Sequence, residues 1–167
     1  GVAKWSDNDE KQFAKLVSQY STHHPKGQFI LDVQFKLGLI YYDKSKYKEA
    51  APIFYSLGNQ FSKVEKGVKS QDLYLDILNH NKDYILLQTY SKQLMSVGKV
   101  DEQRKDKLQN IYEQAYFLEV QTQEDAGKIR EAIVKYKKFV LENPSSKLAE
   151  KAGWNVVQLH FKIVDLK

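Results

Sequence analysis

Histidine is the residue type in this chain best suited to metal binding or proton transfer. Four histidines occur, and two of them are adjacent in the run His23-His24-Pro25. A structural zinc site needs four ligands, and the chain contains no cysteine to complete a histidine pair. We therefore interpret His23 and His24 as residues at the end of a helix. We expect His160 to be a packed or half-buried side chain and not a catalytic one.

Carboxylates and nucleophiles give no catalytic pattern either. Asp43 and Asp125 recur in predicted turns, where a carboxylate caps a helix. The sequence has no Gly-rich phosphate loop, no serine nucleophile elbow and no His-Glu-x-x-His. We expect no catalytic residue, no metal and no cofactor, so the chain is interpreted as a binding module and not an enzyme. An enzymatic role would need its catalytic set in a neighbouring domain.

The charge balance is basic, with a formal net charge of +5. Nearly all of the excess is lysine, since Arg104 and Arg130 are the only arginines. Because recognition of bases and phosphates relies on arginine, we interpret the lysines as solvated helix surface. A basic nucleic-acid-binding helical repeat is kept as the alternative function. No run of about 18 apolar residues occurs, so no membrane span is predicted.

The spacing of apolar residues predicts helices along almost the whole chain. The expected helical segments are 7–21, a hairpin within 31–64, and 67–79, 81–97, 100–123, 127–142 and 146–165. Asp7 or Asn8 is predicted to cap the first helix, with Trp5 packed against its start. Gly98 is predicted to end the helix over 81–97. The fold class is therefore all-α, with about eight helices.

Residues 31–64 carry the most specific pattern in the chain. Five residue types stand there at fixed intervals: Leu37, Gly38, Tyr41, Ala50 and Phe54. This segment resembles a tetratricopeptide repeat, a two-helix unit of about 34 residues. Gly38 and Ala50 are the small residues that let two helix axes approach closely. The segment departs from the repeat signature at Gln34, in place of Trp, and at Ser62, in place of Pro.

Two internal alignments support an array of repeats. Residues 24–42 align with 143–161, and residues 42–50 align with 124–132. The predicted boundaries are a partial repeat over 7–25, repeats over about 28–64, 67–98 and 100–144, and a terminal helix over 146–165. In the middle repeat Leu75 and Leu87 stand where Gly and Ala belong, so the register of 67–105 is left open.

The resemblance implies a right-handed α-solenoid of antiparallel helix pairs, forming a single domain over 1–167. It also implies a non-catalytic scaffold that binds a partner peptide or amphipathic helix in a concave groove. The groove positions that it implies are Asp32, Phe35, Leu39, Tyr42, Phe117, Gln121, Lys151, Trp154, Gln158 and Phe161. Phe35, Phe117 and Trp154 form an aromatic row that either anchors the partner or packs against the neighbouring repeat. Members of the family that bind chaperone tails hold the terminal carboxylate of the tail with a clamp of Lys and Asn side chains. Phe35 and Leu39 stand at two of these clamp positions, which argues against binding of chaperone tails.

The C-terminal region bears on context. The joint at 143–157 is similar to that of bacterial envelope tetratricopeptide proteins, such as the outer-membrane β-barrel assembly lipoprotein and the Tol–Pal coordinator family. This similarity implies a multiprotein bacterial complex and favours a periplasmic or envelope location over a cytoplasmic one. The helix over 146–165 carries two apolar stripes, and burial of both requires a different packed element against each stripe. We expect the chain to be a fragment of a longer protein, or this helix to pair with another chain by self-association.

Overall fold

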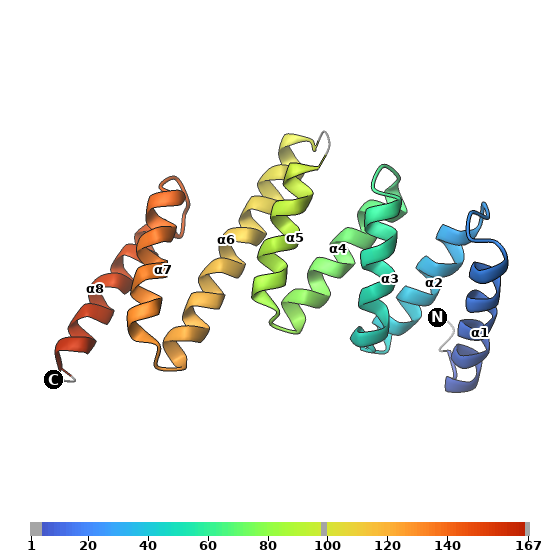
Figure 1. The fold of residues 1–167 in the computed structure, drawn as a ribbon, viewed down its shortest axis with the longest axis horizontal. Coiled ribbons are helices and arrows are strands. Elements are labelled where there is room, and N and C mark those ends of the chain that lie inside the picture. Colours follow the sequence, from blue (N-terminus) through green and yellow to red (C-terminus); the bar gives the residue numbers. More distant parts are fainter. Residues whose placement is uncertain (1–4, 98–99, 166–167) are drawn as a thin grey trace. The chain divides into compact units, whose positions relative to one another are not determined.

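The computed structural model describes residues 5–97 and 100–165, and over these residues the protein is all-α (Figure 1). Eight helices and no strand are present in this part of the chain. The helices are α1 (Asp7–His23), α2 (Ile30–Asp43), α3 (Tyr47–Gln60), α4 (Glu65–His80), α5 (Tyr84–Ser96), α6 (Glu102–Asp125), α7 (Ile129–Glu142) and α8 (Ala149–Asp165). The predicted all-α class and the predicted helical segments are confirmed, with helix ends that differ by a few residues.

The chain divides into two compact units, residues 1–77 and residues 78–167. Most of α4 belongs to the first unit, and its last turn belongs to the second. In the first unit α2 packs against α1 and α3, and in the second unit α6 packs against α5 and α7, and α8 packs against α7. This packing of consecutive helices is consistent with a helical repeat.

The start of α1 differs from expectation in its capping residue. Ser6 is the N-cap, because its backbone is extended and its Oγ accepts a hydrogen bond from the Asp9 amide at 3.1 Å. The prediction of Asp7 or Asn8 was therefore wrong by one or two positions. Trp5 packs against the start of the helix as expected, with its ring centroid 5.1 Å from that of Phe13. Gly98, predicted to end α5, lies outside the described residues.

In the first unit, α2 and α3 form a hairpin with a buried contact between small and aromatic residues. Ala50, Phe54 and Leu57 of α3 are fully buried, and Gly38 of α2 lies against the Phe54 ring. The close helix crossing expected at Gly38 and Ala50 is therefore present.

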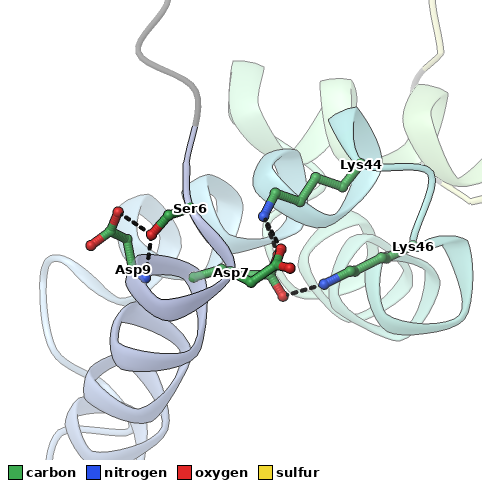
Figure 2. A network of polar contacts seen from close by, with 6 residues as sticks. Ser6, Asp7, Asp9, Lys44 and Lys46 are labelled. Atoms are coloured by element: carbon green, nitrogen blue, oxygen red, sulfur yellow. Dashed lines mark hydrogen bonds and ion pairs between the residues drawn. The ribbon is translucent and has the colours of Figure 1, made fainter.

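A charged cluster attaches α1 to this hairpin. Lys46 Nζ lies 2.6 Å from Glu10 Oε1, and Lys44 Nζ lies 2.9 Å from both Glu10 Oε2 and Asp7 Oδ1. Figure 2 shows Lys44 and Lys46 reaching from the α2–α3 turn toward the carboxylates of α1. The Glu10 carboxylate is buried in this contact, so its charge depends on both lysines for compensation.

In the second unit, α6, α7 and α8 enclose an aromatic core. Tyr136 and Phe139 of α7 are fully buried. The Tyr116 ring lies 5.3 Å from that of Phe139, and the Phe117 ring lies 5.2 Å from that of Tyr136. The α8 side chains that complete this core are Ala152, Val156, Leu159 and Ile163. One face of α8 is therefore covered by the unit itself.

Candidate partner-binding surface

Side-chain contacts recur between residues 34 positions apart. In the first unit, Lys66 pairs with Asp32 and the Tyr42 hydroxyl donates to Asp76, and each pair has this separation. These two contacts join α2 to α4. Residues one such interval apart therefore lie side by side on these two helices.

The second unit repeats this spacing. Gln109 Nε2 donates to Asn143 Oδ1 at 3.4 Å, again across 34 positions. The Lys151 ammonium lies 5.0 Å from the centroid of the Phe117 ring, and these two residues have the same sequence separation. The last contact joins α6 to α8. In each unit, two helices thus lie together so that residues 34 positions apart in the sequence contact each other.

The four sequence-predicted site residues of the first unit make intramolecular contacts. Phe35 is only 7% exposed, with its ring 6.0 Å from that of Phe54, and Leu39 packs against the same core. Asp32 is exposed but paired with Lys66. The hydrogen bond from the Tyr42 hydroxyl to Asp76, together with burial, raises the pKa of Tyr42 to about 12. These contacts stabilise the fold, and Phe35 and Leu39 leave little exposed surface for a partner.

The six predicted residues of the second unit divide differently. Phe117 is buried between Tyr136 and the Lys151 side chain. The other five are exposed: Gln121, Lys151, Trp154, Gln158 and Phe161. The aromatic row is therefore split, since Phe35 and Phe117 pack inside their units and Trp154 is 59% exposed. Packing accounts for the first two rings, and only the third is available as an anchor.

An apolar face covers the outer side of α8. Trp154, Val157, Phe161 and Val164 are all exposed, and they recur every three or four residues. We call these four side chains the α8 apolar face. The prediction of two apolar stripes on this helix is confirmed, because the opposite stripe packs on the core of the unit. Val157 and Val164 belong to this face, although the predicted groove positions did not include them. Their helical spacing from Trp154 and Phe161 is the sequence feature that indicates it.

The surroundings of the α8 apolar face are basic. Among the side chains described over 147–164, Lys147, Lys151 and Lys162 are exposed, and Glu150 is the one carboxylate. On the neighbouring α6, Glu119 is buried and paired with Lys135 at 2.7 Å. Glu113, a second carboxylate of α6, accepts a hydrogen bond from the Ser146 hydroxyl. Over 147–164, the described side chains therefore carry more positive than negative charge.

Two clefts border α1 in the first unit. A cleft of about 430 Å³ is lined mainly by apolar side chains that include Phe13, Leu16, Tyr20 and Val33. A second cleft of about 470 Å³ lies between α1, α2 and α3 and mixes hydroxyl and apolar side chains. The first was not anticipated, although the spacing of Phe13, Leu16 and Tyr20 was visible in the sequence. Neither cleft contains an arrangement of acid, base and nucleophile.

Within residues 5–97 and 100–165, no group of three or more histidines and carboxylates is placed to hold a metal ion. His160 is exposed on α8, so the expectation of a packed or half-buried histidine was wrong. The side chain lies on a part of α8 that no described element covers. Among the described helices, none combines the length and the apolar character that crossing a bilayer requires.

The architecture defines an all-α protein in which consecutive helices pack in pairs. Comparison with models of known protein families and with curated proteins gives no match for this chain.

Proposed function

We propose that this chain is a right-handed α-solenoid of the tetratricopeptide type. It acts as a non-catalytic scaffold that binds a segment of another protein within a multiprotein complex. The observation that carries this proposal is the recurrence of contacts at a separation of 34 residues in both units. This separation equals the length of a tetratricopeptide repeat.

The packing of the α2–α3 hairpin supports the same proposal. A tetratricopeptide hairpin needs small residues where its helices cross, and Gly38 and Ala50 occupy buried positions there. The alignment of α2 with α8 supports a common register. Leu37 and its counterpart Val156 both face the core, although they lie in different units.

The binding site that we propose lies on the α8 apolar face and the exposed polar residues beside it. Large aromatic side chains that project into solvent are the usual anchors of protein interfaces, because they bury much area at little entropic cost. Trp154 and Phe161 meet this description, and Lys151, Gln158 and Gln121 supply polar contacts around them. Phe35 and Phe117 support the scaffold from inside.

A capture experiment tests this proposal. The protein is immobilised and exposed to lysate and envelope fractions of the source cells, beside the double variant Trp154→Ala/Phe161→Ala. The matched control is Val134→Ala/Leu141→Ala, which removes two exposed apolar side chains from α7. We expect a protein that the wild type and the control retain and the site variant loses. Circular dichroism of all three proteins checks that helicity is equal.

Other outcomes would change the assignment. Equal retention by all three proteins would reject the α8 apolar face as the site. Retention of nucleic acid alone, with a steep loss of binding as salt rises, would favour the alternative function of a basic nucleic-acid-binding repeat. The exposed lysines of α8 are the residues that this alternative would use.

A further inference from the structure

Helices α2 and α8 are internal counterparts whose inner faces match. Ile40 of α2 and Leu159 of α8 occupy aligned positions, and both are buried against the core of their own unit. Leu37 and Val156 form a second aligned pair that faces inward. The two helices therefore present corresponding outer faces, and the covered face of α2 shows what fits the open face of α8.

The outer face of α2 is covered by a helix. The Phe54 ring of α3 lies 6.0 Å from the Phe35 ring and 6.3 Å from the Tyr42 ring. Trp154 and Phe161 are the aligned residues of α8, and both are exposed. A helix is therefore the occupant whose shape matches the α8 apolar face, since its side chains also recur every three to four residues.

The aligned helices α2 and α8 differ at the residue where α3 crosses α2, and this difference changes which helix could pack on α8. Gly38 allows α3 to bring the large Phe54 ring onto α2. The aligned residue of α8 is Val157, whose side chain occupies that space. An occupant of α8 therefore needs a small residue opposite Val157, and its larger apolar residues must meet Trp154 and Phe161 on either side.

The charges beside the face select the polar flank of the occupant. Among the side chains described over 147–164, three lysines and one glutamate are exposed, and two of the α6 carboxylates, Glu113 and Glu119, are bound by internal partners. A helix with acidic flanks is attracted to this surface, whereas a basic helix is repelled.

From these observations we propose that the α8 apolar face binds an acidic amphipathic helix of a partner protein, with Ala or Gly at the position that faces Val157. This inference rests on the proposed scaffold function and names the chemistry of its partner.

Tryptophan fluorescence tests the proposal directly. The chain contains two tryptophans, and Trp5→Phe leaves Trp154 as the single reporter. The probe is a synthetic helical peptide of about 20 residues, long enough to form helix on binding. It carries Glu on its polar face and Leu with a central Ala on its apolar face. The control peptides have scrambled apolar spacing, Lys in place of Glu, or Phe in place of the central Ala.

We expect a saturable blue shift of Trp154 emission with the acidic peptide and a gain in helicity by circular dichroism. Affinity should fall at least tenfold for each control peptide. Phe161→Ala in the Trp5→Phe background should weaken binding by a similar factor, and Leu141→Ala on α7 should not. Equal binding of the acidic and basic peptides, or of the scrambled peptide, would overturn the proposal.

Two further results would overturn this inference and leave the scaffold function intact. One is the absence of peptide binding while the capture experiment still yields a partner that depends on Trp154 and Phe161. The other is a concentration-dependent dimer in analytical ultracentrifugation that Phe161→Ala abolishes, because a second copy would then be the occupant. Failure of the capture experiment together with the peptide experiment would reject the scaffold function itself.

Discussion

Gly38 of α2 directly faces the Phe54 ring of α3. A Cβ atom at Gly38 would lie 2.8 Å from Phe54 Cε1 and 3.3 Å from Ile53 Cγ2. Phe54 is fully buried, so its ring has no open space into which it could move. The α2–α3 hairpin therefore depends on glycine at this position.

Gly38→Ala is expected to lower the stability of the protein. Overpacking a buried contact costs about 1–3 kcal/mol, and the better helix propensity of Ala returns about 1 kcal/mol at most. Thermal and urea denaturation followed by circular dichroism measures the net loss. Gly153→Ala in α8 is the control, because nothing lies within 4 Å of a Cβ there. That variant should be as stable as the wild type or more so, and equal effects of the two substitutions would contradict the crossing.

The buried and exposed members of the aromatic row should respond differently to truncation. Phe35→Ala removes a side chain packed on Phe54, and such a change costs about 3–5 kcal/mol. Trp154→Ala removes an exposed ring and should change the free energy of unfolding by about 0.5 kcal/mol or less. Chemical denaturation of both variants gives the comparison. A large loss for Trp154→Ala would mean that this ring packs within the fold.

Glu10 should make the first unit sensitive to acid. Hydrogen bonds from Lys46 and Lys44 lower the pKa of Glu10 in spite of its burial, and Lys44 likewise lowers the pKa of Asp7. A lowered folded pKa gives stability that is fully present above the unfolded pKa of about 4.3. This stability is lost as the pH falls through the lower pKa of the folded form.

Glu10→Gln measures the contribution of this carboxylate. At neutral pH we expect a loss of about 1–3 kcal/mol, below that of a fully buried pair because Lys44 and Lys46 reach solvent. The difference from the wild type should shrink as the pH falls below 4, since Glu10 itself is then protonated. Urea denaturation across this pH range provides the measurement, with the exposed Glu49→Gln as control. A difference that is constant with pH would contradict the ion-pair account.

Tyrosines should give a second pH dependence at the alkaline end. Burial raises the pKa of Tyr116 to about 12, and the hydrogen bond to Asp76 raises that of Tyr42 to about 12. Because the folded pKa is raised, this stability is fully present below the unfolded value of about 10 and is lost as the pH rises toward 12. Ultraviolet absorbance should show tyrosines that ionise well above pH 10. Tyr42→Phe should remove one of them, and titration of all tyrosines near pH 10 would refute the expectation.

The amino-acid sequence by itself determined the helices and most of their limits. The period of apolar residues predicted every described helix, and the small residues Gly38 and Ala50 marked the helix crossing in advance. These features depend on local spacing, which a helix converts directly into a face. Capping was less accessible, because Ser6, Asp7 and Asn8 are all good caps by residue type and the backbone conformation selects among them.

The tertiary structure alone decided which aromatic side chains face solvent. Phe35 and Trp154 occupy aligned positions, yet α3 covers the first and no described element covers the second. Burial of a side chain depends on helices distant in sequence as well as on its own helix. The apolar period could therefore predict which residues share a face of a helix, but not whether another helix packs against that face. The same reason explains the charges beside the α8 apolar face. Only the folded chain brings Lys135 to Glu119 and Ser146 to Glu113, so that these two carboxylates have partners within the unit.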